Sequence, residues 1–156
     1  MTSQCKYYFL HCHPKKSTGV AYAPKELGLF ILPATGYVNS WNTVEFQLKD
    51  GTFVDYQPND MGVRLFSEKL RNIISSSASK NDKMQWFDTI IKDIQGESRV
   101  YYILHFPEQL NVLDRDRTIF AINDFVVKAV LSYDLISDQN VFTFPSAGSM
   151  RFIVSE

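Results

Sequence analysis

The fold of this chain is decided by residues 86–120, which read WFDTIIKDIQGESRVYYILHFPEQLNVLDRDRTIF. Two apolar runs in this stretch, residues 86–91 and 100–106, are each about as long as a strand, and the polar Gln95-Gly96-Glu97 lies between them. Both runs are rich in aromatic and β-branched side chains, which suit a pleated, half-buried surface. The stretch therefore predicts two strands with a turn between them, and it carries no catalytic signature.

The same stretch ends in a charged run, Asp114-Arg115-Asp116-Arg117. If this run is extended, one face carries two acids and the other two bases, because side chains alternate along a strand. The simpler interpretation is a solvated connection. The functional one is an anchored, charged loop that meets an oppositely patterned partner and steers association. Further carboxylates occur at Asp124, Asp134 and Asp138. A glycosidase would need two carboxylates that face each other across a cleft.

Working towards the N-terminus, residues 44–56 predict a β-hairpin. Apolar residues alternate on both sides of Lys49-Asp50-Gly51, and a three-residue loop with Gly51 in the left-handed conformation keeps one face apolar. The cost is one pair of like charges on the polar face. The residues that this register sets opposite each other are Phe46 and Val54, Val44 and Tyr56, and Glu45 and Asp55.

A helix is predicted after this hairpin. Residues 63–66 form a short apolar strand, and Ser67 can cap a helix that runs to about Ser75, with apolar residues at helical spacing. The serine-rich residues 75–83 then predict a mobile loop. The remaining strands are expected at residues 6–13, where Pro14 ends the strand, at 125–131 and 141–144, and in the last apolar run, whose Ser-Glu ending repeats that of residues 63–68.

Length and composition favour one domain over residues 1–156. Apolar residues make up 45% of the chain and aromatic residues 14%, and the formal charge is −1. No basic run exceeds Lys15-Lys16, which argues against a nucleic-acid partner. Neither a secretory signal nor a membrane-length apolar run is visible, so we expect a cytoplasmic protein. Cys5 and Cys12 would lie roughly 23 Å apart on one strand, too far for a disulfide.

The candidate for metal or nucleophilic chemistry is His11-Cys12-His13. On a strand the two histidines share a face about 6.6 Å apart, and Cys5 lies on the same face, but zinc requires three or four ligands. Adjacent Cys12 and His13 would point to opposite sides, which is the wrong geometry for proton transfer, while a pair of Cys12 with distant His105 stays open. Ordinary histidines at a strand end are the simpler interpretation, and no metal or cofactor is predicted.

Trp41 lies among the polar residues Asn39, Ser40 and Asn42. A tryptophan in this setting could anchor an interface with another protein. It could equally be the first core residue of the predicted hairpin strand.

Parts of the chain resemble the bacterial immunity proteins found beside polymorphic and contact-dependent toxins, specifically families eleven and forty-three. The resemblance implies a small cytoplasmic protein with no catalytic role, which binds and neutralises one cognate toxin made by the same strain or its kin. The segments that carry it are KYYFL (residues 6–10), VRLFSEKLRNII (63–74), SRVYYILHFPEQLNVLDRDRTIF (98–120) and MRFIVSE (150–156). The sequence departs from these families in two places: no helix follows Ser155-Glu156, and residues 27–40 match no part of the family pattern.

Together the sequence predicts an α+β fold with a mainly antiparallel sheet and one or two helices, acting as a toxin-binding immunity protein. The residues expected to contact the toxin, and the first to test, are Asp114, Asp116, Arg117 and Trp41. Two other functions stay open: an enzyme or metal protein that uses His11, His13 and a cysteine, and a small-molecule-binding module lined by aromatic residues.

Overall fold

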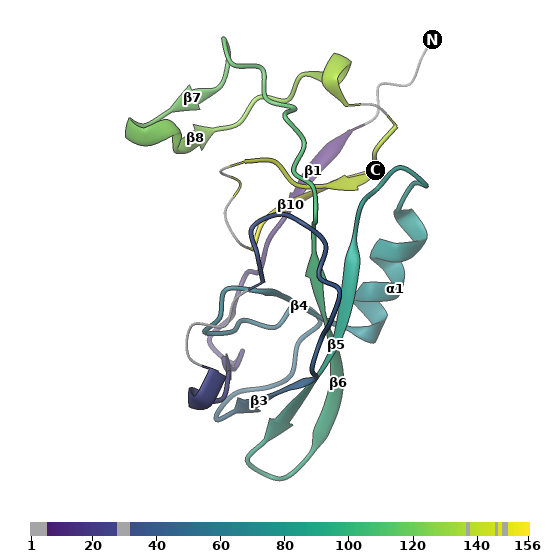
Figure 1. Ribbon diagram of the computed structural model, residues 1–156. Coiled ribbons are helices and arrows are strands. Elements are labelled where there is room, and N and C mark those ends of the chain that lie inside the picture. Colours follow the sequence, from purple (N-terminus) through teal and green to yellow (C-terminus); the bar gives the residue numbers. More distant parts are fainter. Residues whose placement is uncertain (1–5, 28–31, 137, 146, 148–149) are drawn as a thin grey trace.

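The computed structural model describes residues 6–27, 32–136, 138–145, 147 and 150–156, and within them the fold is α+β, as predicted (Figure 1). Its strands form a five-stranded sheet in the order β2-β3-β5-β6-β4, a three-stranded sheet in the order β1-β10-β9, and a β7-β8 ribbon. The strands are β1 Tyr7–Leu10, β2 Ala21–Tyr22, β3 Val44–Leu48, β4 Arg64–Ser67, β5 Gln85–Asp93, β6 Ser98–His105, β7 Ile119–Phe120, β8 Val126–Lys128, β9 Val141–Phe142 and β10 Phe152–Ser155.

Among the residues that the structure describes, the helical elements are α1 (Glu68–Ser77) and three short 3₁₀ turns, η1 (Lys25–Leu27), η2 (Ile122–Asp124) and η3 (Tyr133–Leu135). No helix in the described part of the chain is both long enough and apolar enough to cross a membrane. The sequence does not decide the structure of the short apolar run over residues 27–32, and residues 28–31 of this run lie outside the described residues.

The β5–β6 hairpin is the centre of the large sheet and confirms the prediction from residues 86–106. Its register runs from Gln85 opposite His105 to Lys92 opposite Ser98. In the turn, Oδ1 of Asp93 accepts hydrogen bonds from the backbone N–H groups of Gln95 and Glu97, at 3.0 and 2.8 Å. Gly96 supplies the left-handed conformation between them, with φ +89°.

The predicted strand-to-helix unit is also confirmed. Strand β4 leads directly into α1, and Oγ of Ser67 accepts a hydrogen bond from the backbone N–H of Leu70 at 3.3 Å, which is the N-cap geometry. The helix ends at Ser77 rather than near Ser75. It covers one face of the large sheet at its β4–β6 side, where Ile74 is buried against Phe66 and Leu104.

The prediction of a loop over residues 75–83 is wrong at its start, because the first three of these residues are helical. The rest of the segment is tied to a distant strand through the Asp82 carboxylate. That carboxylate accepts hydrogen bonds from the backbone N–H groups of Ser79, Asn140 and Val141, at 2.7, 3.0 and 3.0 Å. This acceptor joins the end of α1 to the start of β9.

The predicted hairpin over residues 44–56 is wrong. Strand β3 pairs in parallel with β5, placing Phe46 opposite Ile91, and antiparallel with β2, placing Leu48 opposite Ala21. Nine-residue β5 offers β3 a longer apolar partner than the segment after the turn. The expected pairs therefore do not form. The Val54 N–H instead donates a hydrogen bond to Oε1 of buried Gln57, and Tyr56 forms an antiparallel β-bridge with Phe66.

The two acidic side chains that the hairpin register set face to face are apart as well. Glu45 accepts a hydrogen bond from the side chain of Gln47 at 2.8 Å. Asp55 accepts one from the Ser67 hydroxyl at 2.6 Å, beside the N-terminus of α1. The like-charge cost expected from the sequence is therefore absent.

The three-stranded sheet brings both ends of the described chain together. Strand β1 confirms the predicted first strand, but it ends at Leu10, so His11 to His13 lie outside it. It pairs antiparallel with β10, from Tyr7 opposite Ser155 to Leu10 opposite Phe152. A separate core cluster packs on this sheet and includes Val112, Phe142 and Phe144. It supports the part of the molecule that carries the β7–β8 ribbon.

Candidate partner-binding surface

The charged run of residues 114–117 is a closed turn, so its acids and bases do not alternate on two faces. Oδ1 of Asp114 accepts hydrogen bonds from the backbone N–H groups of Asp116 and Arg117, both at 3.1 Å. Oδ2 of Asp114 accepts a third from Nε of Arg117 at 2.7 Å. The side-chain hydrogen bond from Arg117, followed by the one from its backbone, lowers the pKa of Asp114 below its ordinary value.

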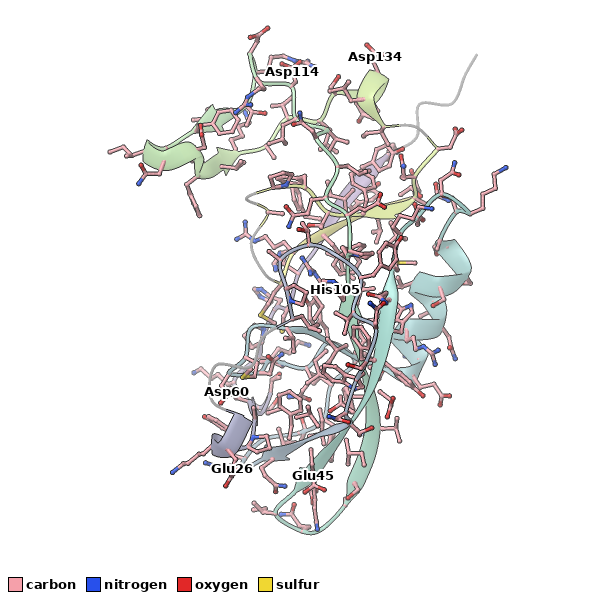
Figure 2. The ribbon with its side chains drawn as sticks, viewed as in Figure 1. Glu26, Glu45, Asp60, His105, Asp114 and Asp134 are labelled. Atoms are coloured by element: carbon pink, nitrogen blue, oxygen red, sulfur yellow. The ribbon has the colours of Figure 1, made fainter. Side chains whose placement is uncertain are left out.

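This turn is anchored to the segment that returns from the ribbon. The Asp114 N–H donates to the Val130 carbonyl at 2.8 Å, and the Thr118 N–H donates to the Asp114 carbonyl at 2.8 Å. The hydroxyl of buried Thr118 also bonds both backbone groups of Val130. Figure 2 shows Asp114 and Asp134 at one end of the molecule and Glu45 at the other. The loop is therefore anchored, as the functional interpretation of the sequence requires, but it is not extended, and its contact with a partner stays a prediction.

We name the ribbon, residues 119–128, the arm. It consists of β7, η2 and β8, and in Figure 1 it extends away from the large sheet and α1. One side packs inward, because Phe120 and Val126 contact the core cluster around Phe142. Large apolar side chains of the arm are nevertheless exposed to solvent: Ile119, Ile122, Phe125 and Val127.

These four apolar residues are absent from the contact residues that the sequence predicted. The interpretation of residues 125–131 as an ordinary strand hid Phe125 and Val127, because a strand was expected to bury its apolar side chains. The signal that could have found them is Asn123-Asp124 between two apolar segments, since these residue types tolerate the left-handed conformation of tight hairpin turns. In the structure their φ values are +64° and +59°.

Trp41 lies on the large sheet, away from the charged turn in the fold. Its ring stacks on Phe87 with 4.8 Å between ring centroids, and its Nε1 donates to the Asp88 carbonyl at 2.8 Å. The side chain packs at the edge of the core cluster formed with β3 and β5. Both alternatives from the sequence thus keep some support, because the ring is partly buried and partly exposed.

The histidine and cysteine candidates do not assemble into a site among the described residues. The His11 and His13 rings lie 6.2 Å apart, but no group of three His, Cys, Asp or Glu side chains that could hold a metal occurs in the part of the chain that the structure describes. Cys12 is a free thiol that donates to the Tyr56 carbonyl, and burial raises its pKa. His105 is buried elsewhere, with Nε2 2.8 Å from the Gly36 carbonyl. Cys5 lies outside the described residues.

A hollow of about 390 Å³ lies beside the end of β6, and its lining includes Arg64 and His105. Nε and Nη2 of Arg64 donate to the Arg151 carbonyl at 3.3 and 2.8 Å, and its guanidinium lies 5.0 Å from the centre of the Phe106 ring. Burial lowers the pKa of Arg64 to about 10. These contacts tie the two larger sheets together, so the hollow is explained as a seam between them.

Replacing Asp114 with asparagine is expected to loosen the charged turn, because the neutral amide cannot form the charge-assisted bond to Arg117. Amide hydrogen exchange at Asp116 and Arg117 should become faster. In the wild type, the Asp114 carboxylate stabilises the folded chain, and because its pKa is lowered, this stabilisation is complete at a pH above the ordinary carboxyl pKa of about 4. The stabilisation is lost as the pH falls through the lowered pKa of Asp114. The control is Asp116→Asn, because Asp116 contributes its backbone N–H to the turn; equal exchange in both variants would contradict the prediction.

In the part of the chain that the structure describes, these features define an α+β protein with two larger sheets, one α-helix, an anchored charged turn and a projecting apolar arm. The chain belongs to the immunity protein family Imm11, whose family model matches residues 33–156. No match was found among curated proteins. The matched range includes β3 to β10 and the whole arm, and the preceding strands β1 and β2 complete the sheets by pairing with β10 and β3.

Proposed function

We propose that this chain neutralises one cognate bacterial toxin by binding to it in the cytoplasm of the cell that makes both proteins. The observation that carries the proposal is membership of the Imm11 immunity family over most of the chain. The toxin belongs to the polymorphic or contact-dependent kind, and neutralisation needs no chemical step. A preformed surface that buries roughly 800 Å² on each partner is sufficient for stable inhibition.

We propose the charged turn as the part of this surface that orients the toxin. Asp114 and Arg117 are held in one arrangement by their own hydrogen bonds, so little side-chain freedom is lost when a partner binds. Asp116 is exposed beside them and offers a carboxylate to a basic group. Trp41 is proposed as a second, separate contact, because a partly exposed indole supplies rigid apolar area.

The proposal is tested by survival of cells that produce the toxin encoded by the neighbouring gene. Cells that also produce this chain should grow as well as cells without toxin, and cells carrying an empty vector should die. The purified chain should form a complex with the purified toxin domain at a one-to-one ratio. Death despite normal levels of folded chain, or rapid turnover of a substrate by the chain alone, would contradict the proposal.

A further inference from the structure

The arm exposes more apolar surface than its position in the fold requires. Ile122 is 88% exposed and Phe125 is 64% exposed, and Ile119 and Val127 are more than half exposed. Single exposed apolar residues are common on protein surfaces, but several within ten consecutive residues form a patch of the kind that marks an interaction site. We name these four side chains the arm tip.

The backbone holds the arm tip in one shape. The Ala121 N–H donates to the Phe125 carbonyl at 2.7 Å, which closes the loop that carries Ile122. Asn123 and Asp124 both have left-handed backbone conformations, which direct the chain back towards β8. At the other end the arm is fixed by the hydrogen bonds between Thr118 and Val130. A preformed projection of this kind loses little conformational entropy on binding.

Charge around the arm tip indicates the chemistry of what covers it. Residues 114–128 contain three acidic and three basic side chains, and Asp114 and Arg117 already neutralise each other. Arg115 lies over the Phe120 ring at 5.5 Å. The surface therefore has no excess charge to match a strongly charged cleft. A partner surface that buries Ile122 and Phe125 must itself be uncharged, because burying an unmatched charge against them would be costly.

A second copy of this chain does not provide such a surface in two of the hollows of its described part. The hollow of about 390 Å³ is lined in part by Arg64 and His105, and the hollow of about 410 Å³ beside the arm by Arg115 and Asp124. An apolar side chain inserted there would remove water from ionisable groups.

We propose that the arm is the main docking element for the toxin, and that Ile122 and Phe125 insert into an uncharged, apolar groove on the toxin domain. This inference rests on the proposed function and specifies which surface carries it. The charged turn at the base of the arm sets the orientation, and the apolar contacts at the tip supply most of the affinity.

The test compares binding of the full chain and of its I122D/F125D variant to the toxin domain encoded by the neighbouring gene. The variant should bind at least about 30-fold more weakly, because it places two charges in an apolar contact. The matched control is I94D: Ile94 is an apolar residue 71% exposed in the β5–β6 turn, far from the arm in Figure 1, and this variant should bind within about threefold of wild type. Wild-type affinity should change by less than about threefold between 0.1 and 0.5 M NaCl.

The outcomes separate the arm from the proposed function. If wild type binds the toxin and I122D/F125D binds equally well, the arm proposal is overturned while the immunity function stands. A wild type that does not bind the toxin overturns both. A wild-type dimer that the double variant abolishes, or affinity that falls steeply with salt, also overturns the proposed occupant. The urea unfolding midpoints of both variants should equal that of wild type. If the double variant unfolds at a lower urea concentration, the I122S variant takes its place in the binding test. Weaker toxin binding by I122S supports the proposal, and unchanged binding overturns it.

Discussion

Replacing Gly51 with alanine is expected to lower the free energy of unfolding by about 3 kcal/mol or more. The new Cβ would lie 2.2 Å from the backbone nitrogen of Gly19 and 2.5 Å from its Cα, distances at which the backbone must move. Gly51 also has φ +71°, a conformation that a Cβ disfavours. The two chain segments therefore cannot keep their present approach. Urea denaturation of the purified variant, monitored by circular dichroism, measures the loss.

The matched control for this prediction is Gly96→Ala in the β5–β6 turn. Gly96 has φ +89°, but a Cβ built there meets no atom within 4 Å. That variant isolates the conformational cost, which is about 1–2 kcal/mol. The difference between the two variants then measures the close approach of the backbones at Gly19 and Gly51. Equal destabilisation by the two substitutions would contradict the packing argument.

Gly51 also shows how far sequence reasoning reaches in this fold. The left-handed conformation was predicted correctly, because it depends on the turn residues themselves. The pairing of the strand before it was wrong, because the alternating pattern of β3 is equally compatible with any apolar neighbour. The strand that pairs with β3 is determined by the length and burial of β5. Strand β3 pairs with β5 in parallel, although a long segment of chain separates the two strands. Local geometry was thus predictable here, and long-range partnership was not.

The candidate site divides in the same way. Asp114, Asp116 and Arg117 could be selected from their composition alone, although their closed turn depends on hydrogen bonds to residues as far away as Val130. The exposure of Ile122 was not predicted, because it depends on how the rest of the chain packs around the arm. That exposure accompanies the position of the arm, which extends away from the large sheet (Figure 1).

Replacing Phe66 with alanine is expected to cost about 3–5 kcal/mol, since it removes a large, fully buried ring. Phe66 connects the large sheet to its surroundings: its ring centroid lies 4.4 Å from that of Tyr56, 6.0 Å from Trp86 and 5.8 Å from Phe152 on β10. Because a domain is stabilised by only about 5–15 kcal/mol, this loss is a large part of the total. Urea denaturation should show a much lower midpoint with little change in slope.

The same substitution at an exposed ring provides the control and links stability to function. Phe125→Ala should leave the free energy of unfolding within about 0.5 kcal/mol of the wild-type value, since Phe125 is largely exposed on the arm. The two variants should then fail to protect cells in different ways. Phe66→Ala protects poorly at high growth temperature and recovers at low temperature, because the folded fraction recovers while the toxin-binding surface is intact. Phe125→Ala protects less well at every temperature, because the folded chain lacks a contact. Recovery of both variants on cooling would mean that the arm acts on stability and not on recognition.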